Sequence, residues 1–287
     1  MITTQVRPAE PKDHKRLSDL IFLETRSHRH LDWRSPLEWL GSEFFWMVEE
    51  GTRITAALAC PTETDGIAWV RLFVHSGYWS AQDAWNVLWD TAKDEIAHAG
   101  GAKVAAIVQQ SWFEKVLAAS GFETRQRIVM LEWQGQYQPW AAPEADGFHI
   151  RKMTETDLPA VEILDLESFG PLWHNSLDTL KRAFAQSLFA TVAENEDGIV
   201  GYQMTTGFAA RAHLARLAVR TSMQGRGIGR ALLGDLFAML KKDGFLKLTV
   251  NTQSDNENSL SLYRKTGFIR TGEEYPVYTF DVPAVPN

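Results

Sequence analysis

The chain has 287 residues, of which 45% are hydrophobic and 23% charged, and its formal net charge is -7. This composition excludes a disordered chain and is typical of a globular protein, and the length favours two domains. The acidic balance argues against a nucleic-acid partner, because contact with phosphates needs a basic surface.

Cys60 is the only cysteine, so we expect neither an intrachain disulfide nor a thiolate metal cluster. The N-terminus lacks an apolar signal core, and no apolar run approaches the ~20 residues that a membrane helix needs. We therefore expect a cytoplasmic protein that binds no metal and no membrane.

Two copies of one pattern fill the chain when it is compared with itself at a shift of about half its length. The matching segments are Val6-Arg7 with Ile150-Arg151, Asp13 with Asp157, residues 70–74 with 215–219, and Gly121-Phe122 with Gly267-Phe268. The repeat predicts domains at residues 1–135 and 148–287. The linker predicted between them, residues 136–147, contains two prolines and has no helical or strand periodicity.

Ten of the eleven tryptophans lie in the N-terminal half. Trp85 and Trp89 are four residues apart on an expected helix, so we expect them to form one packed stripe. A ligand pocket or domain interface lined by Trp33 and Trp39 is a second interpretation of this enrichment.

The second copy has a clear order of expected elements. They are a strand at 148–152, helices near 155–168 and 176–187, a hairpin of strands at 188–194 and 199–206, a strand at 213–219, a helix to about residue 242, a strand at 246–251, a helix at 256–265 and closing strand material at 268–280. This mixture predicts an α+β or mixed-sheet domain.

A glycine-rich turn, Gln224-Gly225-Arg226-Gly227-Ile228-Gly229, joins the strand at 213–219 to the helix that follows. Glycine adopts backbone conformations that other residues avoid, and it lets several amide N–H groups point at one anion. The helix that starts near Ile228 adds its positive N-terminal end. The segment therefore predicts a phosphate-binding turn.

The turn fits the motif Q/R-x-x-G-x-G/A, and residues 256–268 fit N-x-x-A-x-x-L-Y-x-x-x-G-F, with Ser259 in place of the alanine. With both motifs in this order, the second copy resembles the GNAT acyltransferase superfamily, whose members transfer an acyl group from acyl-coenzyme A to an acceptor, usually an amine. The resemblance implies two tandem GNAT-like domains, each a mostly antiparallel mixed sheet flanked by helices.

The resemblance also implies acetyl-CoA as cosubstrate, with its pantetheine arm along the strand before the turn and its pyrophosphate on the turn. The residues implied to bind it are Leu217, Ala218, Val219, Gln224, Gly225, Arg226, Gly227, Ile228, Gly229, Arg230, Asn256, Ser259 and Tyr263. An ordinary strand-to-helix turn without a ligand is the alternative for the loop, and helix capping alone is the alternative for Asn256.

Tyr263 is implied to be the acid that protonates the leaving thiolate, and a buried aromatic residue on an amphipathic helix is the alternative. His213, four residues before Leu217, is the candidate general base, because imidazole titrates in the useful range. A structural histidine, with ordered water relaying the proton, is the alternative.

The first copy is expected to be degenerate, because residues 75–84 contain one glycine and Leu117 stands opposite Tyr263. The predicted function is transfer of an acetyl group to an amine of a small molecule or peptide by direct attack in a ternary complex, since no cysteine in the second copy can carry an acyl group. A non-catalytic acyl-CoA-binding sensor or interaction module is the alternative. We expect a monomer with pseudo-symmetric domains or a homodimer.

Overall fold

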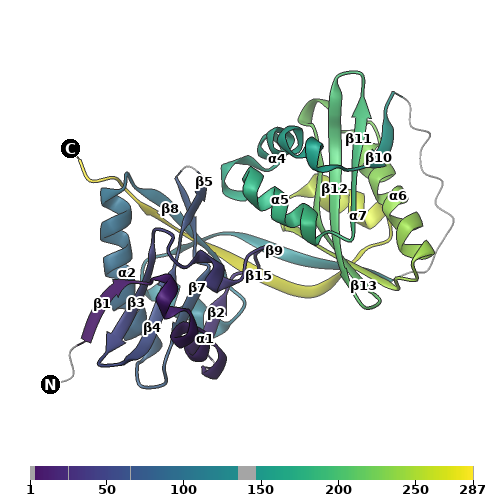
Figure 1. The fold of residues 1–287 in the computed structure, drawn as a ribbon. Helices are drawn as coiled ribbons and strands as arrows, with labels where there is room; N and C mark the ends of the chain where they lie inside the picture. Colours follow the sequence, from purple (N-terminus) through teal and green to yellow (C-terminus); the bar gives the residue numbers. More distant parts are fainter. Residues whose placement is uncertain (1–3, 25, 65, 135–146, 287) are drawn as a thin grey trace. The chain divides into compact units, whose positions relative to one another are not determined.

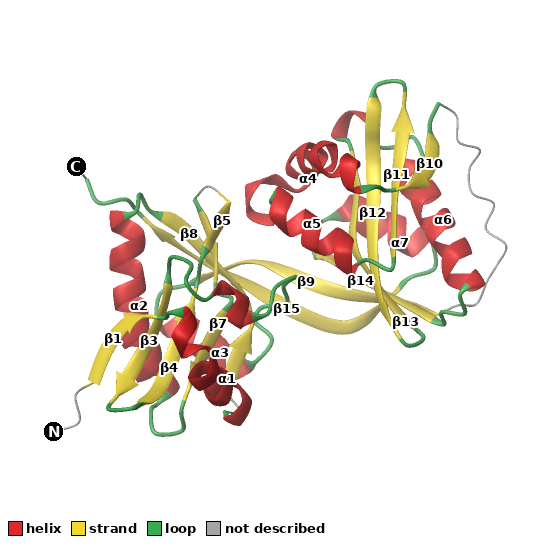
Figure 2. Cartoon of the chain, viewed as in Figure 1, coloured by secondary structure: helices red, strands yellow, loops and turns green. Residues whose placement is uncertain are grey.

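A computed structural model describes residues 4–24, 26–64, 66–134 and 147–286, and it shows helices and strands mixed along the chain (Figures 1 and 2). The chain divides into two compact units. The first unit comprises Met1–Gln126 together with Tyr275–Asn287, and the second unit comprises Arg127–Glu274. Each unit contains helices and mostly antiparallel strands, so the predicted α+β fold class is confirmed.

The second unit has the predicted order of helices and strands. Its elements are β10 (His149–Lys152), α4 (Leu158–Trp173), α5 (Leu177–Gln186), β11 (Phe189–Asn195), β12 (Gly198–Phe208), β13 (Arg211–Val219), α6 (Ile228–Lys242), β14 (Lys247–Gln253), α7 (Glu257–Lys265) and the first part of β15 (Ile269–Val282). The strands pair in the order β10-β11-β12-β13-β14, antiparallel except for β13 and β14, which run parallel.

Adjacent residues of β12 show which helix covers each face of this sheet. The Tyr202 hydroxyl donates to Asp165 of α4, whereas a Cβ atom at Gly201 would lie 3.0 Å from Ile228 of α6. Because side chains alternate along a strand, α4 lies on one face and α6 on the other (Figure 1). Leu260 and Tyr263 of α7 share a buried apolar cluster with α6, so α7 covers the same face as α6.

The first unit has the same kind of elements. They are β1 (Thr4–Pro8), α1 (His14–Leu23), β2 (Ser27–Arg29), β3 (Phe45–Glu50), β4 (Arg53–Ala59), β5 (Thr62–Thr64), β6 (Ile67–Trp69), β7 (Leu72–His75), α2 (Ala81–His98), β8 (Ala102–Ile107) and α3 (Ser111–Ala119). One set of strands pairs in the order β1-β3-β4-β7-β2, and another in the order β15-β8-β6-β5.

The last strand of each repeat copy pairs with a strand of the unit that consists mainly of the other copy. β9 (Glu123–Gln134) is the last strand of the first copy, but it pairs with β14 of the second unit, from Gln253↔Ile128 to Lys247↔Gln134. The end of β15 pairs with β8 of the first unit, from Val277↔Ile107 to Val282↔Ala102. Trp133 of β9 is 6% exposed and its ring stacks on Phe237 of α6 at 4.5 Å. Each unit therefore includes a strand from the other half of the sequence.

This exchange moves the unit boundaries away from the predicted domains at 1–135 and 148–287. Residues 127–134 belong to the second unit and residues 275–287 to the first. The predicted linker, 136–147, lies outside the described residues except for Gly147. A repeat in the sequence gives the order of the strands, but it does not specify which sheet the last strand of each copy joins.

The repeat is visible as one ion-pair triad in each unit. In the first unit Arg7 donates to Asp13 at 2.7 Å and to Glu49 at 2.8 Å, and in the second unit Arg151 donates to Asp157 at 2.8 Å and to Glu194 at 2.7 Å. The hydrogen bonds from these arginines hold the pKa of Asp13 and of Asp157 at about 2. Both triads join the first strand of a copy to its first helical turn and to the strand that it pairs with, β3 in the first unit and β11 in the second.

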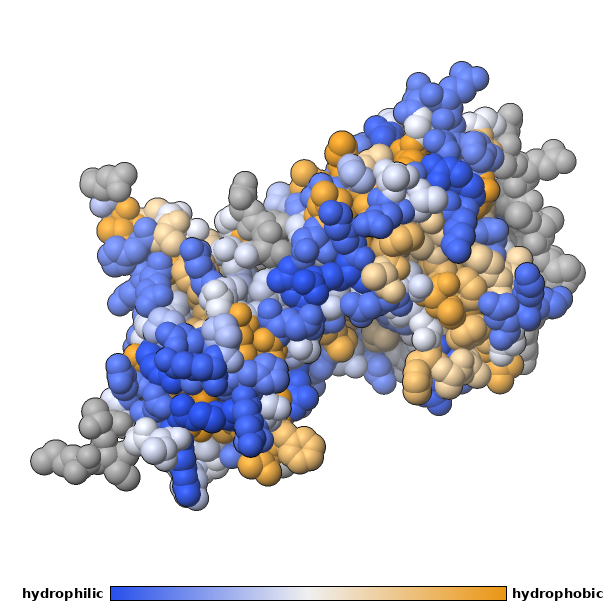
Figure 3. Space-filling view, in the orientation of Figure 1, coloured by the Kyte–Doolittle hydropathy of each residue, from blue (hydrophilic) through white to orange (hydrophobic). Residues whose placement is uncertain are grey.

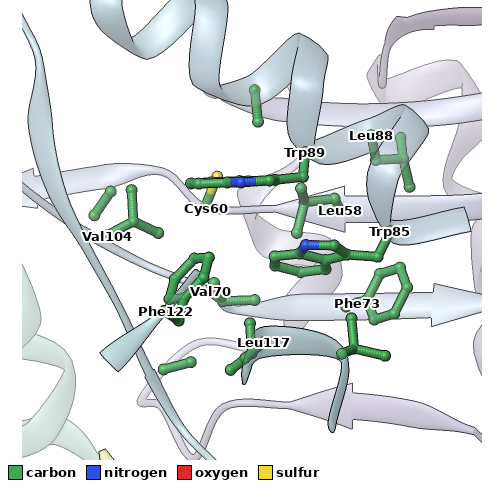
Figure 4. Packing of buried hydrophobic residues seen from close by; sticks show 14 of the residues in the cluster. Leu58, Cys60, Val70, Phe73, Trp85, Leu88, Trp89, Val104, Leu117 and Phe122 are labelled. Carbon is green, nitrogen blue, oxygen red and sulfur yellow. The ribbon is translucent and has the colours of Figure 1, made fainter. Parts of the chain in front are cut away.

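The predicted tryptophan stripe is confirmed in α2. Trp85 and Trp89 are buried, and their rings stack at 5.6 Å between centroids, close to Phe122 (Figure 4). Trp39 is also buried, with the guanidinium of Arg34 4.1 Å from its ring. The tryptophans of α2 therefore belong to the core of the first unit.

The strand exchange predicts which shortened protein folds. Residues 127–274 contain the whole second unit, so we expect this segment to unfold cooperatively in urea, as followed by circular dichroism. Residues 148–287 lack β9 and leave β14 as an unpaired apolar edge, so we expect this segment to aggregate. Cooperative unfolding of 148–287 with aggregation of 127–274 would contradict the exchange.

Candidate active site

The strand β13 separates from β14 halfway along its length. β13 pairs with β14 only from Arg211↔Lys247 to Leu214↔Val250. At this point the pairing of β13 with β12 shifts register between Met204 and Thr205, which leaves Ala215 as an extra residue in β13. Such a bulge bends a strand and increases its twist. Beyond Leu214, β13 stays with β12 and β14 stays with β9.

The backbone of β13 after this point has an open edge, which we define as the side of residues 215–219 that faces away from β12. The Arg220 N–H donates to Val200 O at 2.8 Å, so the Val219 carbonyl in the same peptide points away from β12. Alternation along the strand puts the backbone groups of Leu217 on the open edge as well and those of Ala218 against β12. In the described part of the chain, no strand pairs with the open edge.

Two side chains reach the Val219 carbonyl on the open edge. Ser168 Oγ of α4 lies 3.4 Å from it, and Gln224 Nε2 of the turn donates to it at 3.2 Å. The side chains of Leu217 and Val219 pack in the apolar clusters under α6. The side chains of Leu217 and Val219 are thus partly buried, and their backbone groups on the open edge are available to a ligand that lies extended along β13.

The three glycines of the predicted phosphate turn have different roles. Gly225 has φ 78° and Gly227 has φ 84°, the left-handed region that favours glycine, and Gly227 is the N-cap of α6. Gly229 has no such angle, but a Cβ atom there would lie 3.2 Å from Leu262 of α7. Two glycines thus shape the turn, and the third allows α6 to pack closely against α7.

The turn presents donors for an anion. The first N–H groups of α6, from Ile228 onward, have no carbonyl partner inside the helix, and the helix dipole makes this end positive. Arg226 and Arg230 are exposed at the same place, while the Ile228 side chain is buried and can offer only its backbone. The Gln224 N–H already donates to Thr221 O, so the amides that remain for an anion begin at Gly225.

The start of α7 lies beside the turn. Asn258 Nδ2 donates to Gln224 Oε1 at 3.5 Å. The Asn256 side chain accepts a hydrogen bond from the Ser259 N–H at 3.1 Å. Asn256 therefore caps α7, which is the capping role considered for it in the sequence.

Tyr263 lies in the apolar cluster that also contains Leu214 and Val250, the last paired residues before β13 and β14 separate. It is 4% exposed, its ring centroid is 5.3 Å from that of Phe268, and its hydroxyl has no hydrogen-bond partner among the described residues. Burial raises the pKa of Tyr263, so the phenol keeps its proton at neutral pH and can act as a donor.

His213 precedes Leu214 on β13 and therefore points to the opposite face of the sheet from Tyr263. Its Nδ1 is 2.9 Å from Thr249 Oγ1, which is itself 3.4 Å from the Ala212 carbonyl. When the threonine hydroxyl donates to that carbonyl, it accepts the Nδ1 proton, and Nε2 carries the lone pair. Burial lowers the pKa of His213, which keeps the ring neutral at pH 7.

A buried ionic network next to the open edge was not anticipated from the sequence. Arg216 donates to Asp165 through Nη2 at 2.7 Å and Nε at 3.0 Å, and its guanidinium lies 3.8 Å from the Phe169 ring. Tyr202 and the Asn175 N–H donate to the same carboxylate, and Arg216 also donates to the Trp173 carbonyl. The network ties the kinked end of α4, where Gly170 has φ 70°, to β13.

One sequence signal points to this network. Asp165 is four residues after Val161 and follows Leu164, so it occupies a position on the buried face of α4. A carboxylate at a core position needs a charged partner, because a lone buried charge is very costly. Its partner, on a strand some fifty residues later, cannot be read from local spacing.

Leu117 is fully buried in α3 at the place that the repeat assigns to Tyr263. The described residues contain no group of three or more His, Cys, Asp or Glu side chains placed to hold a metal ion. No described helix is both long and apolar enough to span a membrane. In Figure 3 the visible surface is mainly hydrophilic, with smaller hydrophobic areas.

Part of the chain is similar to known acetyltransferases. Residues 156–279 match the model of the acetyltransferase (GNAT) domain. The chain is 31% identical over 101 residues to peptidyl-lysine N-acetyltransferase YjaB of Escherichia coli (strain K12). The matched region is 35% of this chain and 63% of that protein. The match thus spans less than two thirds of that relative.

Two solved structures share the fold of nearly the whole chain. A tandem GNAT protein from the clavulanic acid biosynthesis pathway, solved without AcCoA, covers 99% of this chain and 100% of its own at a TM-score of 0.65 and 15% identity. A GCN5-related N-acetyltransferase from Sphaerobacter thermophilus covers 99% and 98% at a TM-score of 0.63 and 18% identity.

The network around Asp165 predicts a large loss of stability when its cation is removed. Arg216→Met leaves the carboxylate buried without its main partner, so we expect the free energy of unfolding in urea to fall by about 3–5 kcal/mol. Arg182→Met on α5 is the matched control, because its pair with Asp178 is exposed and contributes less than about 1 kcal/mol. Equal, small losses in both variants would show that the network does not hold α4 on β13.

Proposed function

We propose that the second unit transfers an acetyl group from acetyl-CoA to an amine, on the premise that residues 156–279 match the model of the acetyltransferase (GNAT) domain. The observation that carries the proposal is the open edge of β13, which ends at a glycine turn and the N-terminus of α6. A pantetheine arm, whose amides can pair with a strand edge, and the pyrophosphate that follows it need these two features in this order. In the proposal, one coenzyme occupies both.

The donors present fit acetyl-CoA. The backbone groups of Leu217 and Val219 would pair with the amides of the pantetheine arm in the manner of an added strand. The amides from Gly225 onward, with Arg226 and Arg230 nearby, would hold the pyrophosphate. Acetyl-CoA, when bound, supplies a thioester carbonyl that an amine can attack. Gln224 would have to release the Val219 carbonyl if the arm pairs there.

In the proposed reaction the two predicted catalytic residues work from opposite faces of the sheet. His213 Nε2 takes a proton from the ammonium of the acceptor, which leaves the nitrogen lone pair free for attack. The new C–N bond forms as the C–S bond breaks, the C–S electron pair stays on sulfur, and the nitrogen releases its second proton to solvent. Tyr263 then donates its phenolic proton to that sulfur and regains a proton from solvent.

Direct transfer fits the cysteine content. Cys60 is the only cysteine, it is buried in the first unit, and burial raises the pKa of its thiol. A thiol that stays protonated and shielded is a poor nucleophile, so the acetyl group passes straight to the amine in this proposal. The acceptor is an amine of a small molecule or of a peptide, and the similarity to a peptidyl-lysine N-acetyltransferase supports testing lysine peptides first.

The proposed role of Tyr263 predicts a loss of turnover without a loss of binding. In Tyr263→Phe we expect kcat to fall roughly 100-fold or more with lysine peptides, because the leaving thiolate has lost its acid. Tyr78→Phe is the matched control, since Tyr78 is 86% exposed in the first unit. Release of free thiol measures turnover, and calorimetry measures acetyl-CoA binding. Binding by the wild-type protein without turnover on any amine would favour a non-catalytic acyl-CoA-binding module.

The proposed role of His213 predicts the pH dependence. Because burial lowers the pKa of His213, its neutral form is the main one at pH 7, and kcat/KM should fall on the acid side only below pH ~6.5. In His213→Gln we expect a lower kcat and no such acid limb. Thr249→Ser keeps the hydroxyl at Nδ1 and should keep the limb. An unchanged acid limb in His213→Gln would assign the base to another group.

A further inference from the structure

In the first unit, as in the second, the strands that lead to the long helix separate from their parallel neighbour. Here the strands are β6 and β7, the helix is α2 and the neighbour is β8. β6 pairs in parallel with β8, from Ile67↔Lys103 to Trp69↔Ala105, as the start of β13 pairs with β14. β7 then continues beside β4 and no longer beside β8, as the end of β13 continues beside β12 and no longer beside β14. The two units therefore share this separation of strands, which we call the fork. In the second unit the fork produces the open edge.

Cross-strand partners identify which residues of β7 face this edge. The Ser76 N–H donates to Thr55 O at 2.7 Å, as the Arg220 N–H donates to Val200 O. The His75 carbonyl and, two residues earlier, the backbone groups of Phe73 therefore point away from β4. In space, Phe73 and His75 correspond to Leu217 and Val219, one residue later than the sequence repeat suggests.

In the first unit this edge is occupied by the chain itself. β2 pairs antiparallel with β7 through Ser27↔Val74, His28↔Phe73 and Arg29↔Leu72, on the side opposite β4. The His30 N–H extends the pairing and donates to Arg71 O at 3.0 Å. β2 thus lies where an extended ligand would lie along β13 in the second unit.

The strand β2 is part of the core of the first unit. His28 is 4% exposed, its ring stacks on Phe113 of α3 at 4.3 Å, and its Nε2 donates to the Val70 carbonyl at 3.1 Å. Burial lowers the pKa of His28 to about 4, so it stays neutral at pH 7 and keeps this contact. Arg29 Nη2 donates to Ile21 O of α1 at 2.8 Å. Displacing β2 would break all of these contacts.

The same connection of the repeat has different structures in the two units. Between the first helix and the next hairpin, the second unit forms helix α5, which Ser176 caps. The first unit forms β2 and, further on, a short helical turn at Pro36–Trp39. The segment that covers the edge in one unit therefore packs elsewhere in the other.

The turn after β7 is also unfavourable for binding an anion. Gly77 does not have a left-handed φ, unlike Gly225 and Gly227. At the start of α2, Ser80 accepts a hydrogen bond from the Asp83 N–H, and the Asp83 carboxylate lies in the first turn of the helix. A negative group at this place repels a phosphate, whereas the start of α6 has Arg230.

We propose that β2 permanently fills the coenzyme position of the first unit, so that the chain binds one acetyl-CoA and binds it in the second unit. The proposal rests on the proposed function, since it takes the open edge of β13 as the acetyl-CoA site. The first unit is then a closed copy of the acyltransferase fold, and the first copy of the sequence repeat supplies β9 to the sheet of the second unit.

Titration calorimetry with acetyl-CoA tests the number of sites in the full chain. We expect one equivalent for the wild type and for Gly77→Val, which changes the turn of the first unit. Gly227→Val forces a β-branched residue into a left-handed φ, so we expect binding to weaken at least about tenfold with no second site remaining. Two equivalents, or a full-affinity site left in Gly227→Val, would overturn the proposal.

Amide hydrogen exchange tests the closed edge without any ligand. By mass spectrometry of the free protein, we expect residues 71–75 to exchange at least about 100-fold more slowly than residues 215–219, because β2 covers only the former. Acetyl-CoA should slow residues 215–219 alone. Equally fast exchange of both segments would refute the closure by β2, whereas a protected β7 with no acetyl-CoA binding would refute only the proposed function.

Discussion

The separation of β13 from β14 after Leu214 is the constraint on which the candidate site depends. A single extra residue, Ala215, bends β13 away from its parallel neighbour and leaves one row of backbone groups without a strand partner among the described residues. The turn at Gly225 and Gly227 follows at the end of that row. Tyr263 and His213 lie on opposite faces of the sheet where β13 and β14 separate. The open edge therefore begins beside Tyr263 and His213 and ends at the glycine turn.

The two units share one scaffold, but the strand edge is open in one unit and covered in the other. Both keep the Arg-Asp-Glu triad that ties the first strand to the hairpin, and both keep the fork in the strand before the long helix. What differs is the connection after the first helix, a segment of lower structural constraint than the sheet. In the second unit Asp165 and Arg216 fasten the end of α4 beside the edge, whereas in the first unit β2 lies on the edge itself.

Local patterns were enough to predict the elements of the second unit, the turn and the cap at Asn256, because these depend on residues close together in sequence. The exchange of β9 and β15 could not be predicted, since a strand has the same alternation whichever sheet it joins. β2 has only three residues, too few for a periodic signal. The partner of Asp165 is equally non-local, although the carboxylate itself stands on the apolar face of α4.

The strand exchange also sets the order in which the two units can be completed during synthesis. The second unit is a continuous segment, Arg127–Glu274, nested inside the first, which needs Tyr275–Asn287. Until those last residues leave the ribosome, β8 lacks its partner in β15 at Ala102–Ile107. The unit that is translated first is therefore finished last, after the proposed catalytic unit is already whole, and its closing contact joins residues far apart in the chain.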